Sequence, residues 1–417
     1  MHLAQHEISG TIQIPASKSH TQRAYACALL FNGITEIQHA GHSQDEQTAL
    51  SIIQQLGASV NIQDNKTIIR SNGKLSTLSS IDCGESGLCT RMFLPILATT
   101  SNRYTITGTG SLLKRKMEHI NQFAHALCIQ LNSNNEYLPL TIEGPIKGSH
   151  LTIDGQESSQ YLTGLLIALA YTCTTDMHIE VQGLVSKPYI DLTLQLLSSL
   201  GMPIKNEHYQ HFYISPKKSL PSLPSLQNIS IESDWSSASN FIVLAAIKGK
   251  IQLKGLHAES VQADKAILKV LDQVGSNIEW KANSIHIDQH KKNPFAINIV
   301  DCPDLFPILC VLAGTCSGTS SIKGIHRLTH KESNRLVSCS AMMQQLGIPF
   351  AIQDDTVLIE GVAAFKGASI DSCNDHRIAM AASIASAYTK DPITFIGDDA
   401  VNKSYPNFFN DLKLLIN

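Results

Sequence analysis

The segment Met342-Met-Gln-Gln-Leu-Gly347, followed by Phe350-Ala-Ile352 and Thr356-Val-Leu-Ile359, decides the fold of this chain. It predicts a helix that ends at a glycine and runs into a hairpin of two short strands, because glycine adopts the left-handed conformation that closes a helix. The same pattern ends at three further glycines: Gly57, Gly201 and Gly275. The sequence therefore predicts repeated α/β units.

The spacing of these glycines is about 70 residues, or about twice that between Gly57 and Gly201. A weaker copy fills the longer gap, with a helix at 123–131 and a strand at 138–142. A last helix, at 407–416, ends the chain before its hairpin appears. The chain is therefore predicted to hold six units, the sixth without its hairpin.

The boundary between two domains is predicted from the only Pro/Ser-rich stretch, residues 215–227, which follows the third unit. Residues 7–14 alternate like a strand and are expected to cross over and complete the C-terminal half. One domain then comprises residues 1–14 and 229–417, and the other residues 15–228. Hinge crossings near 14–18 and 225–233 would join them, with small ligands in a cleft between domains.

Composition excludes several classes of protein. The 417 residues include 32 Lys and Arg against 35 Asp and Glu, a net charge of −3 that argues against nucleic-acid and membrane-surface binding. Ten cysteines without CxxC pairs predict neither a zinc site nor a disulfide framework, and His39 and His42 are interpreted as loop histidines. The first residues do not resemble a signal peptide, and the longest apolar run, 162–173, is too short to span a bilayer. We expect a cytoplasmic protein with reduced thiols.

Each unit carries a polar cluster immediately before an apolar, buried-type helix. The clusters are Ser17 to His20, Gly84 to Gly87, Glu157 to Gln160, Ser233 to Ser237, Pro303 to Leu305 and Asn374 to Arg377. Any one of them is explained as an ordinary helix N-cap. Six buried helix N-termini accompanied by Lys, Arg and Ser instead predict an anion-binding site.

Arginine is scarce in this chain, and six of its eight copies lie in or beside polar segments. Arginine is preferred where a carboxylate or phosphate is bound through two parallel hydrogen bonds. Lys331 and Arg335 would share one helical face, with Glu332 between them. This trio is interpreted either as a surface ion pair or as part of a site that binds an anion and transfers a proton.

Eight motifs in order along the chain resemble those of the EPSP synthases (enolpyruvylshikimate-phosphate synthases). They are Ile14 to Arg23, Asp82 to Gly87, Ser158 to Gln160, Ser186 to Tyr189, Pro303-Asp304, Lys331 to Arg335, Asp375 to Arg377 and Lys403 to Pro406. The resemblance implies an α/β fold of two domains, each of three βαβαββ units. Such a fold is of the inside-out α/β barrel type, with an active-site cleft between the domains.

The resemblance also implies a reaction. Phosphoenolpyruvate gives its carboxyvinyl group to the 5-hydroxyl of shikimate 3-phosphate by addition and elimination, releasing phosphate, on the shikimate pathway to aromatic amino acids. Neither metal nor organic cofactor is implied, and the protein is expected to be a monomer. The proton-transfer candidates are Lys18, Asp304 and Glu332. Asp304 is expected to take the hydroxyl proton and Glu332 or Lys18 to protonate the methylene carbon.

The implied substrate contacts fall into two sets. Shikimate 3-phosphate would contact Lys18, Ser19, Arg23, Ser158, Ser159, Gln160, Ser186, Tyr189, Asp304, Arg327 and Lys331. Phosphoenolpyruvate would contact Lys18, Gly87, Arg115, Gln160, Arg335, His376, Arg377 and Lys403.

Several positions depart from the usual family pattern. Ala16 replaces Gly, Glu85 replaces Asn, Leu88 replaces Thr, Lys116 replaces Pro and Arg327 replaces an Asn that contacts the shikimate phosphate. We expect these changes to alter the affinity for phosphoenolpyruvate and for glyphosate-like inhibitors. Glu85 would repel an anionic substrate unless it forms an ion pair. Arg91 and Arg115 are the candidate partners.

Two alternatives have their own sequence signatures. A UDP-N-acetylglucosamine enolpyruvyl transferase typically carries a Cys in a Gly-Gly-Cys context, and no such motif occurs in this sequence. A binding protein without turnover is suggested by Glu85 and Leu88, whereas the retained Lys18, Asp304 and Glu332 argue against it.

Overall fold

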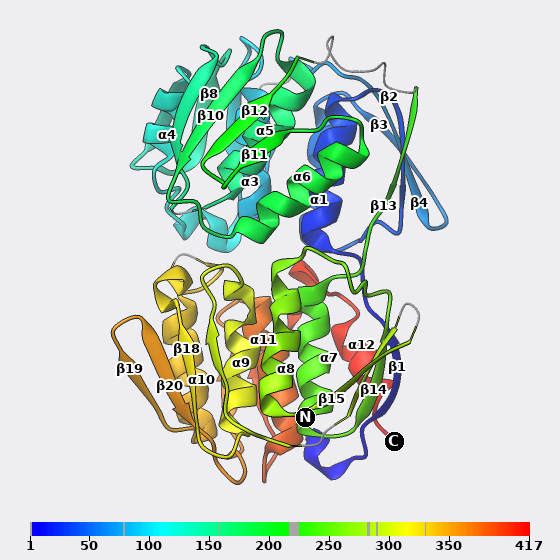
Figure 1. Cartoon of the computed structure of the whole chain (residues 1–417), viewed down its shortest axis with the longest axis vertical. Coiled ribbons are helices and arrows are strands. Elements are labelled where there is room, and N and C mark those ends of the chain that lie inside the picture. The colour runs from blue at the N-terminus through cyan, green and yellow to red at the C-terminus, as the bar shows by residue number, and fades with distance from the viewer. Residues whose placement is uncertain are drawn as a thin grey trace. The chain divides into compact units, whose positions relative to one another are not determined.

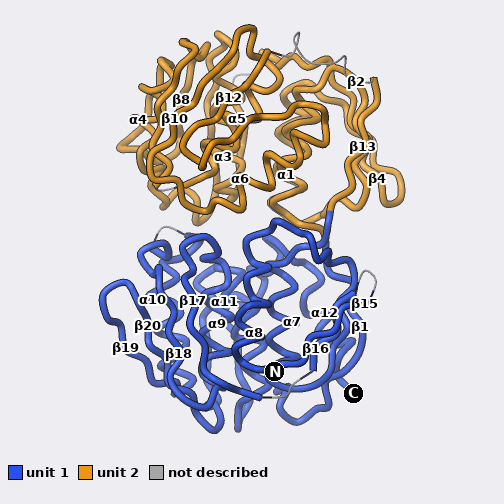
Figure 2. Tube along the Cα trace, in the orientation of Figure 1, with its two compact units in different colours: residues 1–15, 232–417 blue, residues 16–231 orange. Residues whose placement is uncertain are grey.

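The computed structural model describes residues 2–77, 80–156, 158–216, 225–281, 284–288, 291–329 and 331–417. The chain divides into two compact units (Figure 2), with residues 1–15 and 232–417 in unit 1 and residues 16–231 in unit 2. The boundaries expected from the sequence lie one and three residues from these. Residues 217–224 of the Pro/Ser-rich stretch lie outside the described residues.

Unit 2 contains three four-stranded sheets, one for each sequence repeat (Figure 1). Their strand orders are β13(Leu226–Ser230)-β2(Asn32–Gln38)-β4(Lys66–Asn72)-β3(Ser59–Gln63), β5(Ser80–Asp82)-β6(Arg103–Thr107)-β8(Tyr137–Glu143)-β7(Gln130–Asn134), and β9(His150–Asp154)-β10(Met177–Gln182)-β12(His211–Ile214)-β11(Lys205–Glu207). In each sheet the first two strands pair in parallel and the others antiparallel. Parallel neighbours require a crossover, which a helix supplies in each repeat.

Unit 1 repeats the pattern in its described residues, with two four-stranded sheets and one of two strands. The orders are β1(Ser9–Gln13)-β14(Lys250–Lys254)-β16(Ser284–Asp288)-β15(Asn277–Lys281), β17(Ala296–Asn298)-β18(Thr319–Lys323)-β20(Thr356–Glu360)-β19(Phe350–Gln353), and β21(Ser369–Asp371)-β22(Thr394–Ile396). The sixth repeat ends in a short helix. The sequence predicted this ending, because its pattern shows no hairpin after the sixth helix.

The N-terminal strand β1 pairs in parallel with β14 of the fourth repeat, and Ile8 forms a bridge to Ile416. In unit 2, β13 from the end of the linker pairs in parallel with β2 of the first repeat. The N-terminal strand therefore joins a four-stranded sheet of unit 1 and does not replace the hairpin that the sixth repeat lacks.

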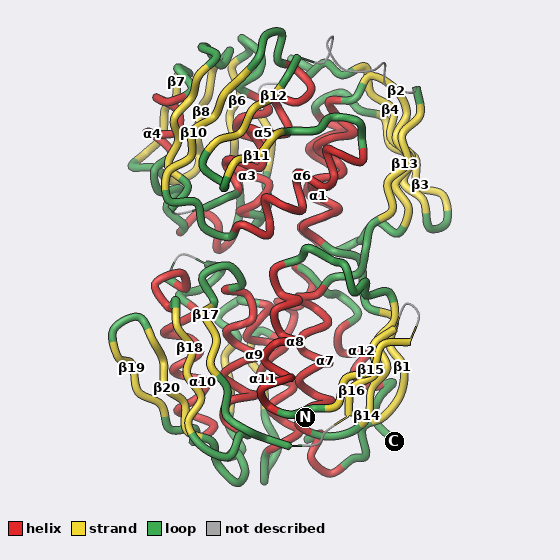
Figure 3. The backbone as a smooth tube through the Cα atoms, viewed as in Figure 1, coloured by secondary structure: helices red, strands yellow, loops and turns green. Residues whose placement is uncertain are grey.

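Within the described residues, each unit has three inner helices that contact one another and three outer ones, with the sheets outside the inner helices (Figure 3). The inner helices are α1(Lys18–Leu30), α3(Gly87–Leu97) and α5(Gln160–Thr172) in unit 2, and α7(Trp235–Ile247), α9(Phe306–Gly314) and α11(His376–Ala385) in unit 1. The outer helices are α2(Gln44–Gln55), α4(Ile120–Ala126), α6(Lys187–Ser199), α8(Ile267–Val274), α10(Arg335–Leu346) and α12(Phe408–Lys413).

The inner helices are buried because their sequences have almost no polar face. Every residue of α7 is buried, as are residues 161–171 of α5. Their N-termini carry the polar clusters, and Ser17, Ser86, Asp234 and Asp375 accept backbone hydrogen bonds there as N-caps. Gly275 and Gly347 end α8 and α10 with φ of 83° and 72°, which confirms the predicted left-handed helix ends.

Short 3₁₀ helices connect these elements. They are η1(Leu3–Gln5), η2(Gly110–Lys114), η4(Ala263–Ala266), η5(Pro303–Leu305), η6(Ile325–Leu328), η7(Ser386–Tyr388) and η8(Asp398–Lys403). Within the described residues, no helix is long and apolar enough to cross a membrane. The same residues contain no group of three or more His, Cys, Asp or Glu that could hold a metal ion.

Candidate active site

Arg23 on α1 is the central cation of unit 2. The guanidinium donates to the hydroxyl of Thr193 (2.9 Å), the carbonyl of Ser19 (2.7 Å), the hydroxyl of Thr163 (3.3 Å) and the carbonyl of Tyr189 (3.4 Å). These bonds tie α1 to α5 and α6, so Arg23, Ser19 and Tyr189 lie together as the sequence motifs implied.

Arg23 is only 1% exposed, and all of these acceptors are neutral. Among the residues that the structure describes, no carboxylate forms an ion pair with it. Burial consequently lowers the pKa of Arg23 to about 10, with Tyr189 and Cys27 opposing the shift. A buried cation whose charge is not neutralised favours the binding of an anion nearby.

Lys18 begins α1 and donates to the carboxylate of Asp45 at 2.8 Å. Asp45 lies on α2, and its carbonyl accepts a hydrogen bond from Gln22. Gln22 also bonds the Ser86 hydroxyl at the N-terminus of α3, which places the ends of α1 and α3 side by side. No sequence signal pointed to Asp45, because it lies outside the eight motifs.

Two arginines converge on Gly87, the first residue of α3. A Cβ atom added to Gly87 would lie 3.0 Å from Nη1 of Arg91 and 3.1 Å from Nη1 of Arg115. Arg91 also bonds the side-chain oxygen of Gln160 at the start of α5 (3.2 Å). Arg115 Nε is buried without a hydrogen-bond partner in the described part of the chain. The two cations at a helix N-terminus suit an anion that approaches the backbone closely.

The segment that carries Arg115 is fixed by the residues that depart from the family pattern. Glu85 accepts hydrogen bonds from the backbone and the hydroxyl of Ser111 (2.9 and 2.6 Å), at the start of η2. The Ser111 hydroxyl lies 3.5 Å from Arg115, so it links Glu85 to that arginine. Lys116 pairs with Glu136 at 3.3 Å.

Three serines lie at the starts of α5 and α6. Ser159 is the N-cap residue of α5, and the Ser158 hydroxyl accepts from the backbone of Gln160 (3.2 Å). Ser186 precedes α6 in a left-handed conformation with φ of 55°, which is rare for a residue with a side chain. Both helix N-termini therefore offer hydroxyl groups and backbone donors to an anion.

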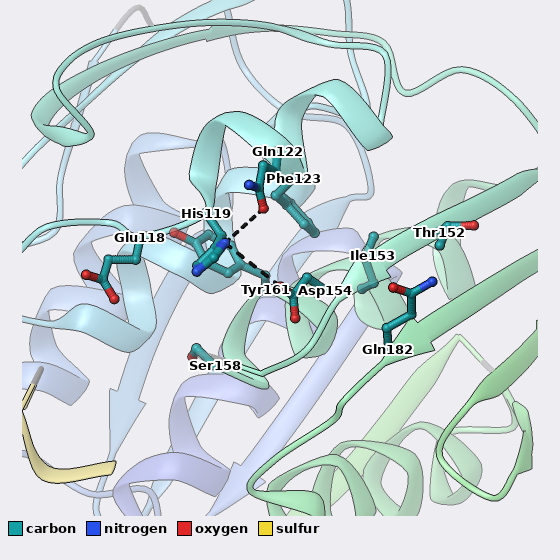
Figure 4. A pocket seen from close by; sticks show the side chains of 10 residues that line it. All are labelled: Glu118, His119, Gln122, Phe123, Thr152, Ile153, Asp154, Ser158, Tyr161 and Gln182. Carbon is teal, nitrogen blue, oxygen red and sulfur yellow. Dashed lines mark hydrogen bonds and ion pairs between the residues drawn. The ribbon is translucent and has the colours of Figure 1, made fainter. Parts of the chain in front are cut away.

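A pocket of about 190 Å³ lies beside Ser158 and Tyr161 (Figure 4). His119 in its wall bonds Gln122 at 2.8 Å and faces Asp154 at 3.9 Å. The carboxylates of Glu118 and Asp154 belong to the lining, so the pocket does not favour an anionic substrate.

In unit 1, Arg335 at the first turn of α10 binds three carboxylates. The distances are 2.5 Å to Asp304, 2.6 Å to Glu332 and 2.8 Å to Asp375. The carboxylates stabilise the cation against the cost of burial and raise the pKa of Arg335 well above its usual value. Arg335 of the predicted trio is therefore a buried cation paired with carboxylates and not half of a surface ion pair, whereas Lys331 and Glu332 are half-buried.

Asp304 also pairs with Arg377 at 3.4 Å. Burial opposes ionisation of Asp304, but the charges of Arg335, Arg377 and Lys331 prevail and hold its pKa below the usual range. Burial lowers the pKa of Lys331 to about 8, with Asp304 opposing and Arg327 reinforcing the shift.

The start of α11 completes this cluster. Asp375 is fully buried and accepts from the backbone of Arg377 at 3.0 Å. Its neighbour His376 is 2% exposed, and Lys403 in η8 bonds the carbonyl of Asn374 at 2.8 Å. The structure thus joins Arg335 and Arg377 to Asp304, and Glu332 to Arg335, through ion pairs, while His376 and Lys403 lie at and beside the start of α11.

Sequence reasoning missed three residues of these clusters: Asp45, Arg91 and Asp375 in their site roles. Asp375 belongs to the motif Asp375 to Arg377, and the sequence analysis assigned it no role of its own. Arg91 was considered as a partner of Glu85, whereas its side chain contacts Gln160, Gly87 and the Tyr161 ring.

Comparison with solved structures defines the class of protein first. An EPSP synthase structure from Acinetobacter baumannii shares the fold with a TM-score of 0.80 and 24% identity, covering 99% of this chain and 96% of the other. The enolpyruvyl transferase NikO from Streptomyces tendae has a TM-score of 0.75 and 14% identity, with coverage of 99% and 96%. The fold is therefore that of the enolpyruvyl transferases, which confirms the predicted fold class.

The particular family follows from sequence comparison. The family model described as EPSP synthase (3-phosphoshikimate 1-carboxyvinyltransferase) matches residues 3–412. Proteins named 3-phosphoshikimate 1-carboxyvinyltransferase from Clostridium kluyveri and Clostridium novyi are 32% and 33% identical, covering 98% of this chain and 95% of each relative. The chain belongs to the EPSP synthase family, and the resemblance seen in its motifs is confirmed.

Proposed function

We propose that this protein is a 3-phosphoshikimate 1-carboxyvinyltransferase. It transfers the carboxyvinyl group of phosphoenolpyruvate to the 5-hydroxyl of shikimate 3-phosphate and releases phosphate. The observation that carries the proposal is the family match over residues 3–412, in a chain that retains Lys18, Asp304 and Glu332 within its polar clusters.

Shikimate 3-phosphate is assigned chiefly to unit 2. Ser158, Ser159 and Ser186 offer their hydroxyls, and the N-termini of α5 and α6 add favourable dipoles for the phosphate. Arg23 supports this assignment because its buried charge has only neutral partners. Ser19, Gln160 and Tyr189 are proposed to position the ring, with Arg327 and Lys331 of unit 1 reaching the phosphate.

Phosphoenolpyruvate is assigned to the remaining cations: Arg115 beside Gly87 in unit 2, and Arg335, Arg377, His376 and Lys403 in unit 1. Lys18 and Gln160 are proposed to contact both substrates. Arg335 already holds three carboxylates, so an anion that binds it has to displace Asp304 or Glu332 from at least one nitrogen. Asp375 remains as its permanent partner because that carboxylate is fully buried.

The addition step forms a bond between the 5-oxygen and C2 of phosphoenolpyruvate, while the 5-hydroxyl loses its proton and C3 gains one. We assign the first proton transfer to Asp304 and the second to Glu332 or Lys18. Elimination then removes a proton from C3 and expels phosphate from C2, which restores the carbon–carbon double bond. Displacing Arg335 from Asp304 would raise the pKa of that carboxyl and make it a better base.

The test is phosphate release by the purified protein after treatment with a metal chelator. Phosphoenolpyruvate is supplied with shikimate 3-phosphate and, in parallel, with UDP-N-acetylglucosamine. We expect release with shikimate 3-phosphate alone. Release with only the sugar nucleotide would contradict the substrate assignment. A folded protein that binds shikimate 3-phosphate yet releases no phosphate would establish the binding-protein alternative.

The monomeric state and the cytoplasmic location remain predictions from the sequence. Sedimentation equilibrium at assay concentration measures the first, and a mass near 45.4 kDa is expected for a monomer. Fractionation of the source cells measures the second.

A further inference from the structure

Three histidines lie on the outer face of the third sheet of unit 2, on three neighbouring strands. They are His150 on β9, His178 on β10 and His211 on β12, and the last two strands run side by side (Figure 1). Side chains alternate between the two faces of a strand, and on β10 Ile179 and Val181 are buried while His178 is half-buried. The histidines therefore project from the face opposite the core, where the proposed chemistry does not use them.

Two of these rings already contact each other. Nε2 of His178 lies 3.1 Å from Nδ1 of His211, within hydrogen-bond distance. Two nitrogens bound to one Zn²⁺ at about 2.0–2.1 Å are about 2.9 Å apart at a right angle and about 3.4 Å apart at the tetrahedral angle. The observed separation lies between these limits, so both nitrogens can bind one ion after the rings tilt toward it.

Neighbouring rings hold His178 in place. The Tyr213 ring stacks on it, with centroids 4.6 Å apart and an angle of 7° between the planes. The ring of His150 meets it edge-on, with centroids 4.5 Å apart. A ligand whose ring is held by its neighbours loses little freedom when it binds an ion.

The charges around His211 favour a cation. Glu180 on β10 and Glu207 on β11 lie opposite it in the registers of the two adjacent strands. Glu180 faces Nε2 of His150 at 3.8 Å, and Glu207 pairs with Lys205 at 2.6 Å. Two carboxylates and one lysine leave an excess of negative charge beside the two imidazoles, which attracts a positive ion.

We propose that His178 and His211 form a surface site for one divalent transition-metal ion of the zinc type, with water in the remaining positions. Imidazole nitrogen is a preferred ligand of such ions, whereas Mg²⁺ and Ca²⁺ prefer oxygen. Water is required because the described residues provide no group of three or more His, Cys, Asp or Glu that could hold a metal ion. When the ion binds, the proton between the two rings moves to the other nitrogen of the ring that carried it.

This site is separate from the proposed reaction. His150 and His178 lie near the beginnings of β9 and β10, whereas Ser158 and Ser186 follow the ends of these strands. The ion is therefore expected to join β10 to β12 and to stabilise the third sheet without taking part in turnover.

The experiment titrates the chelator-treated full-length protein with Zn²⁺ by isothermal calorimetry, with Mg²⁺ in a parallel titration. We expect one Zn²⁺ per chain at this site and no binding of Mg²⁺. At a hundred times the measured Kd, Zn²⁺ should raise the melting temperature by about 5 °C.

Two variants remove one ligand each. H178F keeps a ring that can stack on Tyr213 but has no nitrogen, and H211Q keeps a polar side chain without an imidazole. Each should weaken Zn²⁺ binding by at least about tenfold and abolish the rise in melting temperature. H257F, at an exposed histidine of unit 1, is the matched control and should bind Zn²⁺ as the wild type does. Melting without metal verifies that each variant is folded, and either ligand variant decides if the other is not.

The outcomes are distinct. Absence of Zn²⁺ binding by the wild type, or equal affinity in H178F, H211Q and H257F, would overturn this inference. Phosphate release should be unchanged in H178F and H211Q, and a loss of turnover in these folded variants would contradict the separation of the two sites. A wild type that binds Zn²⁺ yet releases no phosphate would support this inference and contradict the proposed function.

Discussion

Arg23 in unit 2 and Arg335 in unit 1 are equally buried arginines in opposite electrostatic surroundings. Arg23 donates only to hydroxyl and carbonyl oxygens, whereas Arg335 binds the carboxylates of Asp304, Glu332 and Asp375. The pKa is lowered to about 10 for the first and raised for the second. Arg23 in unit 2 is thus a cation whose described hydrogen-bond partners are neutral, while Arg335 in unit 1 is a cation already paired with carboxylates.

The difference separates two ways of binding an anion. A ligand of Arg23 gains the attraction of a cation that has no other counter-charge in its hydrogen bonds. A ligand of Arg335 has to replace carboxylates, and each carboxylate it releases becomes more basic. We therefore expect the same residue type to serve binding in one unit, and both binding and proton transfer in the other.

The largest expected effect is on stability, in R335M. Removing the cation leaves Asp375 fully buried and close to two further carboxylates, and breaking such a buried pair costs about 3–5 kcal/mol. Urea unfolding measures the loss, with R70M, at an exposed arginine of β4, as the control. A loss no larger than that of R70M would show that the three ion pairs contribute little.

R23M should separate binding from stability. Because the guanidinium has no carboxylate partner among the residues that the structure describes, its replacement by an apolar side chain is expected to change the free energy of unfolding by less than about 1 kcal/mol. Thr163 and Thr193 keep a hydrogen bond to each other, so few polar groups lose their partners. The value of kcat/KM for shikimate 3-phosphate should fall about a hundredfold, as expected for a charged contact worth about 3 kcal/mol. If R23M lost as much stability as R335M, the two arginines would not differ in their contribution to the free energy of unfolding.

Lys331 of unit 1 should make both substrate binding and stability depend on pH. Above pH 8 its ammonium group loses its proton, so the KM for shikimate 3-phosphate should rise by about threefold to tenfold up to pH 9.5. K331R stays charged and should not show this rise. Because the pKa in the folded state lies below that of the unfolded chain, the folded state binds fewer protons between about pH 8 and 10.5, and the contribution to stability rises with pH there.

In the wild type, binding and stability should therefore move in opposite directions as the pH rises, and both changes should be absent in K331R. Initial rates and urea unfolding at matched pH values measure them. An identical dependence of KM on pH in both proteins would mean that another group titrates in this range.

The smallest effect is expected for E85Q. Glutamine is neutral, so the bonds from Ser111 lose their charge-assisted strength, worth about 1 kcal/mol, and η2 loosens around Arg115. The KM for phosphoenolpyruvate should rise about twofold to fivefold, because positioning is weakened while the arginine is retained. E143Q on β8 is the control. A lower KM in E85Q would show that Glu85 repels the substrate, as the sequence alone suggested.

The repeats, the six buried inner helices and the family were predictable because each depends on local patterns. A helix without a polar face has to be buried, and a glycine after an apolar run closes a helix wherever that run packs. The partner of β1 was not predictable in this way, because an isolated alternating segment fits the edge of any sheet. The sequence also left Lys331, Glu332 and Arg335 open between a surface ion pair and part of a site that binds an anion and transfers a proton.

The sequence by itself determined the order of six α/β units, the polar clusters before their inner helices and the reaction class that eight motifs indicate. Only the tertiary structure decided that Arg335 binds three carboxylates, that Glu85 bonds Ser111 and that Lys18 pairs with Asp45. The physical reason is that charge and burial depend on neighbours distant in the chain, and these determine which arginine is neutralised and which acid is held ionised by nearby cations.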